Sequence, residues 1–314
     1  MTMRSSISFV LDGKVVTEDF SKPSVTPTTT VLNYLRSLPT HKGAKEGCAE
    51  GDCGACTVVL GELDAGNTIR YKAVDSCLVF LPMIHGKQLI TVENLKTEAA
   101  LHPVQQAMVD TGGSQCGYCT PGIVMSLFAL YKNHDHPDRN VIDEALTGNL
   151  CRCTGYKPIV EAAARSCIHQ GIDSSSNDEI RIAGLLQSIP RHSALIQTSN
   201  HTYFQPRTLL EALTLKHQHP EAIIIGGSTD VALRVTKNHE QLRQLLDVSL
   251  VDELHTIRNH SESLSFGSGV VLNEVWSAVE ADFPALADMF AVFGSLQIRN
   301  LATLGGNIGS ASPI

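Results

Sequence analysis

The 314-residue sequence has no cysteine after Cys167, which is the last of its nine cysteines. It also lacks any apolar run of the roughly 18 residues that a membrane-spanning helix needs. Basic residues do not predominate, because 24 Lys and Arg against 32 Asp and Glu give a net charge of -8. That balance argues against nucleic acid or an anionic membrane surface as the main partner.

The first twenty residues do not have the pattern of a secretory signal. They alternate like a strand and carry Arg4, Asp12 and Lys14. We therefore expect a cytoplasmic protein. No Ser–His–Asp, paired-carboxylate or nucleotide-hydrolysis signature is present, and the thirteen histidines are scattered. The cysteines remain as the chemical signal, and in a reducing compartment clustered cysteines indicate metal ligation rather than a disulfide framework.

The length fits two or three domains, and the periodicity changes along the chain. Residues 4–95 combine strands, a short helix and a Gly-rich loop, whereas residues 96–172 follow a helical period in four segments. Residues 173–196 are polar and Ser-rich in their first part, which predicts a linker. Residues 197–314 mix strands and helices. The predicted fold class is α+β.

Local signals predict the individual elements. Apolar residues on either side of Asp12-Gly13 predict a hairpin over residues 6–17. The threonines at 28–30 are suited to cap a short helix. Other helices are predicted at 103–109, 121–131, 141–146, 158–170 and 209–217, and strands at 57–60, 69–92 and 222–225.

The first cysteine set begins with Cys48, Cys53 and Cys56, which have the spacing Cys-x4-Cys-x2-Cys. This is the arrangement of plant-type ferredoxins, and Cys77 is the fourth candidate by elimination. Zinc favours paired short hooks, and only one is present here, so the spacing favours a two-iron, two-sulfur (2Fe-2S) cluster. Glycines should allow positive φ angles and bring amide donors to the sulfurs; they are Gly43, Gly47, Gly51 and Gly54.

The second cysteine set consists of two pairs that each precede a predicted helix. Cys116 and Cys119 precede Pro121, and Cys151 and Cys153 come before Pro158. Helix starts present free N–H groups and a partial positive charge, which suits an anionic cluster. By spacing alone, zinc and 2Fe-2S both remain open.

A Gly-rich turn follows the strand predicted at 222–225. In Gly226-Gly227-Ser228-Thr229, successive backbone N–H groups can face a phosphate, with two hydroxyl donors. A second turn, Gly305-Gly306-Asn307, comes about eighty residues later. By itself, either turn can also be an ordinary strand end.

Three segments carry a family resemblance. GSQCGYCTPGIVMS (113–126) and GNLCRCTGYKPIV (148–160) resemble the second 2Fe-2S domain of the molybdenum hydroxylases, and EGCAEGDCGACTVVL (46–60) resembles the ferredoxin-type domain of the same family. The resemblance, which is strongest to xanthine dehydrogenase-type members, implies one cluster on the first set and another on the second. It implies that Gln115 contacts the molybdopterin of a partner, and it gives Cys167 no ligand role.

The resemblance extends to the FAD-binding domain of that family. It implies that a run of eight residues holds the FAD pyrophosphate, namely Ile224, Ile225, Gly226, Gly227, Ser228, Thr229, Asp230 and Val231. It also assigns Phe293 and Thr303 to the FAD pocket, with Gly305, Gly306 and Asn307 beside it. The chain ends at Ile314, inside a motif that in the family continues with Ser-Asp. We therefore expect part of the FAD domain to lack its cover, with FAD binding by this chain weakened.

The implied function is electron transfer as the iron–sulfur and flavin subunit of a xanthine dehydrogenase-type enzyme. A molybdopterin-binding large subunit would oxidise the purine, and electrons would pass through the second set, the first set, FAD and NAD. The assembly would be heteromeric, for example a dimer of heterodimers. Two alternatives are a flavin-free 2Fe-2S carrier or non-functional fragment, and the small subunit of an aldehyde or aromatic-heterocycle hydroxylase.

Overall fold

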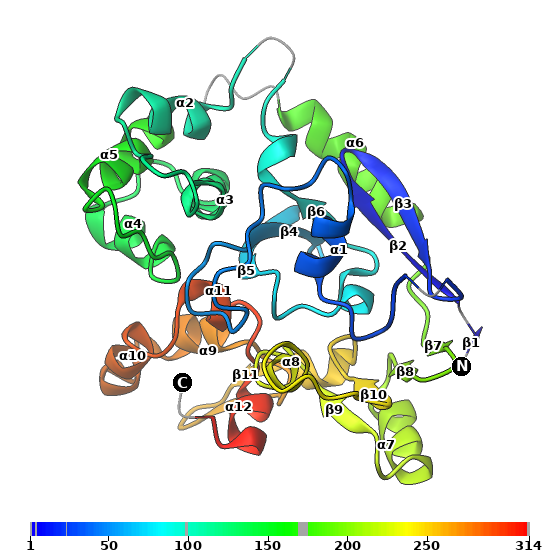
Figure 1. Ribbon diagram of the computed structural model, residues 1–314. Coiled ribbons are helices and arrows are strands. Elements are labelled where there is room, and N and C mark those ends of the chain that lie inside the picture. The colour runs from blue at the N-terminus through cyan, green and yellow to red at the C-terminus, as the bar shows by residue number, and fades with distance from the viewer. Residues whose placement is uncertain (1, 4, 23, 98–99, 169–174, 313–314) are drawn as a thin grey trace.

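The computed structural model describes residues 2–3, 5–22, 24–97, 100–168 and 175–312. Two sheets and a group of helices meet around a shared centre (Figure 1). The mixture of strands and helices confirms the predicted α+β class. None of the described helices combines the length and the apolar character needed to cross a membrane.

The first sheet is a five-stranded, mixed sheet with the order β3-β2-β6-β4-β5. Its strands are β2 (Ser6–Leu11), β3 (Lys14–Asp19), β4 (Thr57–Leu63), β5 (Ile69–Asp75) and β6 (Gln88–Ile90). The predicted hairpin is confirmed, with positive φ at both turn residues, Asp12 and Gly13. The stretch 69–92 is a strand only at its two ends, because the 3₁₀ turn η1 (Leu81–Ile84) lies between β5 and β6.

The helix α1 (Val31–Ser37) begins where the threonines predicted it. The hydroxyl of Thr30 accepts the backbone N–H of Asn33 and so caps the helix. One face of α1 is fully buried with the sheet residues Ile7 and Phe9. The Gly-rich loop that carries the first cysteines, residues 43–56, follows this buried helix in the chain.

All four helices predicted in the second region are present around a central helix, α3. They are α2 (Pro103–Asp110), α3 (Thr120–Asn133), α4 (Arg139–Ala145) and α5 (Lys157–Ser166). Helix α3 is buried from Gly122 to Tyr131 because it packs between the other helices and strands β4 and β5. The end predicted for the last helix, Gln170, lies outside the described residues.

The predicted linker at 173–196 is wrong for its described part, where a 14-residue helix, α6 (Ser175–Ser188), forms. Ile182, Leu186 and the following Ile189 are buried at spacings of four and three residues, which makes an apolar face within a polar sequence. The carboxylate of Glu179 accepts from the hydroxyl of Tyr71 at 3.0 Å. The helix is therefore packed onto the first two regions, and only the composition suggested a linker.

The third region contains the second five-stranded sheet, with the order β1-β7-β8-β10-β9. The strands are β1 (Thr2–Met3), β7 (Ala194–Gln197), β8 (Thr202–Gln205), β9 (Ile223–Ile225) and β10 (Gln244–Asp247). Strand β10 runs parallel to both β8 and β9. Strand β1, from the start of the chain, pairs with β7 and so links the third region to the first.

Helices and one hairpin complete the third region. They are α7 (Leu209–Gln218), α8 (Val231–Thr236), the hairpin β11 (Ile257–Asn259) and β12 (Leu264–Phe266), α9 (Leu272–Val279), α10 (Pro284–Ala291), α11 (Leu296–Arg299) and α12 (Leu304–Ser310). The predictions of strand 222–225 and helix 209–217 are confirmed to within about a residue.

The short helix α11 joins the third region to the other two. The side-chain amide of Gln297 donates to Ser126 at 2.9 Å and to Asn149 at 3.0 Å, both in the helical region. Arg299 is fully buried, forms an ion pair with Glu144 and lies 4.9 Å from the ring centre of Trp276. These buried polar contacts fix the orientation of the three regions.

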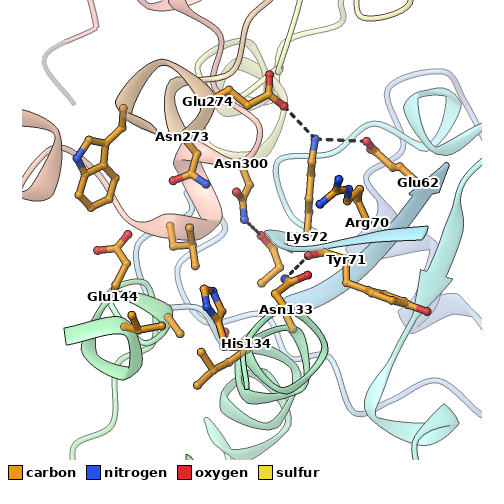
Figure 2. Close-up of a pocket in the computed structure, with 18 of the residues that line it drawn as sticks. Glu62, Arg70, Tyr71, Lys72, Asn133, His134, Glu144, Asn273, Glu274 and Asn300 are labelled. Carbon is orange, nitrogen blue, oxygen red and sulfur yellow. Dashed lines mark hydrogen bonds and ion pairs between the residues drawn. The ribbon is translucent and has the colours of Figure 1, made fainter. Parts of the chain in front are cut away.

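A cavity of about 830 Å³ lies where the three regions meet. Figure 2 shows Lys72 between Glu62 and Glu274, with which it pairs at 3.4 and 3.8 Å. Lys87 also pairs with Glu62, at 2.7 Å, and these two cations hold the pKa of Glu62 well below its ordinary value against the cost of burial. These two lysines and two glutamates are therefore paired with one another.

Candidate functional site: two cysteine sets and a glycine-lined cavity

The first set lies at one end of the first sheet. Cys56 immediately precedes β4 and Cys77 follows β5 by two residues. Because Thr57 and Asp75 face each other in the ladder, the two cysteines meet, with their sulfurs 3.5 Å apart. Cys48 and Cys53 form a second contact pair from the Gly-rich loop. The four cysteines of the predicted set thus form two contact pairs.

Backbone amides face the sulfur of Cys48. The N–H groups of Glu50 and Asp52 donate to it at 3.4 and 3.3 Å. A hydrogen bond from Cys53 and these amide donors lower the pKa of Cys48 to about 5. The contact with Cys77 and the burial raise the pKa of Cys56. One thiol of this set is accordingly held ready as a thiolate, the form that binds metal.

The glycines of the loop act in two ways. Gly51 and Gly54 have the predicted positive φ, at 85° and 66°. Gly43 and Gly47 do not, so the prediction is wrong for these two. At Gly47 the reason for glycine is space, because a Cβ there would lie 2.7 Å from the sulfur of Cys53. The loop can approach its own sulfurs only because this side chain is missing.

The second set lies at the starts of two helices, as the sequence indicated. Cys119 is the residue before α3, and Cys151 and Cys153 lie in the loop before α5. Each sulfur contact joins the two motifs: Cys116 meets Cys153, and Cys119 meets Cys151. The set therefore depends on the packing of α3 beside α5.

The second set faces outward. Cys116 and Cys153 are exposed, as are Gln115, Tyr118 and Leu150 around them. The other pair, Cys119 and Cys151, is less exposed. Burial and, after it, the contact with Cys151 raise the pKa of Cys119 to about 12. The hydroxyl of Thr154 lies 3.1 Å from the sulfur of Cys151. A group bound here would therefore be more exposed at Cys116 and Cys153 than at Cys119 and Cys151.

Each set contains four cysteines arranged as two contact pairs. Among the described residues, no three His, Cys, Asp or Glu side chains converge on a point where they could hold a single metal ion. A structural zinc site needs four ligands around one ion. A 2Fe-2S cluster takes four thiolates distributed over two irons. Two sets of two pairs fit the two-iron cluster.

The predicted flavin residues line one cavity of about 470 Å³ between the end of β9 and the start of α12. All eight residues from Ile224 to Val231 line it, together with Thr303, Gly305, Gly306 and Asn307. The sequence did not predict six further lining residues. They are Val248, Ala302 and four small residues, Ser268, Gly269, Gly309 and Ser310. The sequence signal that could have indicated these four residues is their arrangement in two pairs of neighbours, Ser268-Gly269 and Gly309-Ser310. Phe293 is not among the lining residues, and its ring lies against that of Phe290 at 6.3 Å between centres.

Glycine makes this cavity possible. A Cβ on Gly227 would lie 1.7 Å from the carbonyl oxygen of Leu301, and one on Gly305 would lie 2.5 Å from the Cβ of Ser268. Two loops far apart in sequence can therefore contact each other, which leaves a cavity lined largely by backbone, a surface suited to a phosphate group. This lining fits the pyrophosphate of a dinucleotide.

Two side chains of the turn are already engaged. Ser228 has a φ of 60° and is buried, and its hydroxyl donates to the carbonyl of Leu78 in the first region. The expectation that this hydroxyl serves a phosphate is therefore wrong in this structure, and of the two predicted hydroxyl donors Thr229 remains. The carboxylate of Asp230 accepts from Ser310 at 2.6 Å and from Ser312 at 3.1 Å.

Comparison with known families matches two parts of the chain. Residues 91–164 match a [2Fe-2S] binding domain, and residues 197–314 match the FAD binding domain in molybdopterin dehydrogenase. These ranges contain the second cysteine set and the glycine-lined cavity.

Curated relatives are similar to this chain over almost its whole length. A xanthine dehydrogenase from Drosophila pseudoobscura pseudoobscura is 36% identical over 99% of this chain and 27% of its own length. Aldehyde oxidase 3 of Mus musculus is 32% identical over 97% of this chain and 26% of its own. A solved quinoline 2-oxidoreductase from Pseudomonas putida 86 is 27% identical over 58% of this chain and 95% of that one, with a TM-score of 0.44.

The chain spans about a quarter of the length of the curated relatives it matches. Within that span lie the iron–sulfur and flavin modules, with the cysteine pairs and the cavity described above. The chain belongs to the molybdenum hydroxylase family, of which it carries the 2Fe-2S- and FAD-binding region.

Proposed function

We propose that this chain carries electrons between a molybdenum-bound substrate site on a partner and FAD, in an oxidoreductase of the xanthine dehydrogenase type. The observation that supports this most directly is the arrangement of the cysteine pairs: one set is open to the surface, and the other is joined to the cavity loop. The hydroxyl of Ser228, in the cavity loop, donates to Leu78, the residue next to Cys77. A relay needs such an order of an outer and an inner centre.

The proposed ligands are all thiolates. One cluster would be held by Cys48, Cys53, Cys56 and Cys77, and the other by Cys116, Cys119, Cys151 and Cys153. When bound, each 2Fe-2S cluster takes up and returns one electron. The chain supplies amide donors, such as those of Glu50 and Asp52, that stabilise the negative charge of the sulfurs. It also limits access of water to Cys56 and Cys77, which are almost fully buried.

The proposed FAD site is the glycine-lined cavity, with the loop 224–231 beside the pyrophosphate. We also propose the division of the chain into domains at 4–95, 96–172 and 197–314. Helix α6, between the last two, would join them as a packed element.

The proposed partner is a large molybdopterin-binding chain that docks on the face around Gln115. Tyr118 and Leu150 are 48% and 59% exposed there, and exposed apolar side chains beside an outer redox centre are typical of a docking surface. NAD would be the final electron acceptor, and the assembly would act in cytoplasmic purine catabolism as a heteromer such as a dimer of heterodimers.

Xanthine or hypoxanthine is the proposed substrate, since the relatives with 36% identity are xanthine dehydrogenases. Oxidation of an aldehyde or an aromatic heterocycle is the second candidate, supported by the aldehyde oxidases at 32% identity. The substrate site would belong to the partner, so coexpression with a large molybdopterin-binding chain and assay of both substrate classes would distinguish them.

The electron-transfer proposal predicts about four irons per chain, in two clusters with distinct EPR signals. Metal analysis and EPR of the purified, reduced chain measure this directly. Flavin extracted from the same sample separates the proposal from a flavin-free carrier, because stoichiometric FAD excludes the carrier. Two irons or fewer, or a single EPR signal, would contradict the proposed relay.

A further inference from the structure

Helix α8 connects the glycine-lined cavity with the first cysteine set. Its N-terminal end follows Asp230 in the loop that lines the cavity, and its C-terminal end is followed by Lys237. At 1.5 Å per residue, a six-residue helix spans only about 9 Å. One short, rigid element therefore extends from the cavity to the cysteine loop.

At each end of α8, a side chain is hydrogen-bonded to a segment that carries a cysteine of the first set. At the start, the hydroxyl of Ser228 donates to the carbonyl of Leu78, next to Cys77. At the end, the ammonium of Lys237 donates to the carbonyl of Cys48 at 3.2 Å. It also forms an ion pair with Glu50 at 2.9 Å. The two halves of the cysteine set are thus fastened to the same helix.

The charges around the loop give Lys237 an electrostatic role as well. Glu50 and Asp52 place two carboxylates beside Cys48, and Lys237 is the cation that pairs with Glu50 there. A lysine ammonium is charged at neutral pH. An added electron increases the negative charge on a cluster, and a fixed cation nearby stabilises that reduced state.

We propose that Lys237 is a positioning residue for the first cluster: it fastens the Cys48 loop to the helix that starts at the flavin cavity, and it raises the affinity of that cluster for an electron. This inference rests on the proposed cluster at Cys48, Cys53, Cys56 and Cys77. Through Lys237, the third region would then help to set the reduction potential of the first cluster.

The test is a redox titration of the full chain carrying Lys237→Gln. Dithionite supplies one electron to each cluster, and EPR follows the two signals separately. The equilibrium constant for reduction of the first cluster should fall about three- to tenfold, because a positive charge in contact with the Cys48 loop is lost and solvent screens it only in part. This corresponds to roughly 30–60 mV for a one-electron couple. The second cluster should keep its potential.

Arg234→Gln is the matched control. Arg234 lies one turn earlier on α8 and pairs with Glu240 at 2.7 Å, so this change removes the same charge from the same helix. It should shift the first potential by much less. Lys237→Arg should restore most of the wild-type value, because the cation remains. Glu50→Gln keeps Lys237 and removes an acid, so it should shift the first potential upward.

The outcomes are distinguishable. If the wild-type chain shows no first-cluster signal, the proposed function fails, and the inference fails with it. If the signal is present and Lys237→Gln leaves its potential unchanged, or Arg234→Gln shifts it equally, the inference alone is overturned. If Lys237→Gln does not fold, the direction of the Glu50→Gln shift decides, and a potential that stays or falls counts against the proposal.

Discussion

The two cysteine sets contain the same four donors, yet the fold surrounds them differently. Cys56 and Cys77 are 2% and 1% exposed because they lie at the ends of paired strands under the third region. Cys116 and Cys153 are exposed because they lie on loops ahead of two helices. In the proposed relay, this difference would separate an inner centre, held by strands, from an outer centre, presented at the surface by helix starts.

The third region supports each set with a different short helix. Helix α8 is fastened to the first cysteine loop through Lys237, whereas α11 is inserted against the helices that carry the second set, through Gln297 and Arg299. The outer centre therefore depends on neutral and charged hydrogen bonds buried at a junction. The inner centre depends on its own sheet and on a partly exposed lysine.

The largest expected effect comes from removing one ligand of each set. Cys77→Ser should abolish the first EPR signal and also lower the stability of the protein, by about 1–3 kcal/mol, because it leaves a hydroxyl in a buried site. Cys116→Ser should abolish the second signal at little cost in stability, because the position is exposed. EPR and thermal unfolding of the two variants measure both parts. Equal destabilisation would contradict the difference in burial.

The next effect concerns the support of the second set. Arg299→Met leaves Glu144 without its buried partner and should cost about 3–5 kcal/mol of stability. Arg207→Met is the control, since Arg207 pairs with a well-exposed Asp252 and should cost less than about 1 kcal/mol. Chemical denaturation gives both values. We also expect the second EPR signal to broaden in Arg299→Met, and an effect on the first signal alone would be incompatible with the role of α11.

The smallest expected effect is a difference between the rates at which the two clusters lose iron. When the isolated chain is reduced and exposed to an iron chelator, the second cluster should lose iron first, since its outer thiolates are open to solvent. The decay of the two EPR signals with time gives the order. Addition of a partner that covers the face around Gln115 should slow the loss from the second set and leave the first unchanged. If the first, more buried set lost its iron earlier, the proposed difference in solvent access between the two sets would be wrong.

Local sequence predicted most elements correctly because the local signals were sufficient there. Thr30 caps α1, the Asp12-Gly13 turn closes the first hairpin, and both cysteine pairs of the second set precede helices. The prediction of a linker at 173–196 was wrong in its described part, since the polar composition concealed the face formed by Ile182 and Leu186. The buried environment that stabilises this helix comes from residues far away in the chain.

The cavity was predicted in part. The glycines of its two turns are visible in the sequence, since only glycine permits such close contact between the two loops. Phe293 was assigned by resemblance, yet it packs against Phe290 instead of lining the cavity. The role of Ser228 was also different from the expected one, because its hydroxyl is taken by a carbonyl 150 residues away.

The sequence by itself determined which residues can carry the chemistry: eight cysteines in two sets and two glycine turns, since residue type and short spacing are local properties. Only the tertiary structure decided how the cysteines pair, which set is open to solvent, and which helix joins the glycine-lined cavity to the first set. Those features depend on contacts between segments distant in the chain, such as Cys116 with Cys153 and Lys237 with Cys48. No local pattern encodes such contacts, because they arise when the apolar faces of three regions are buried together.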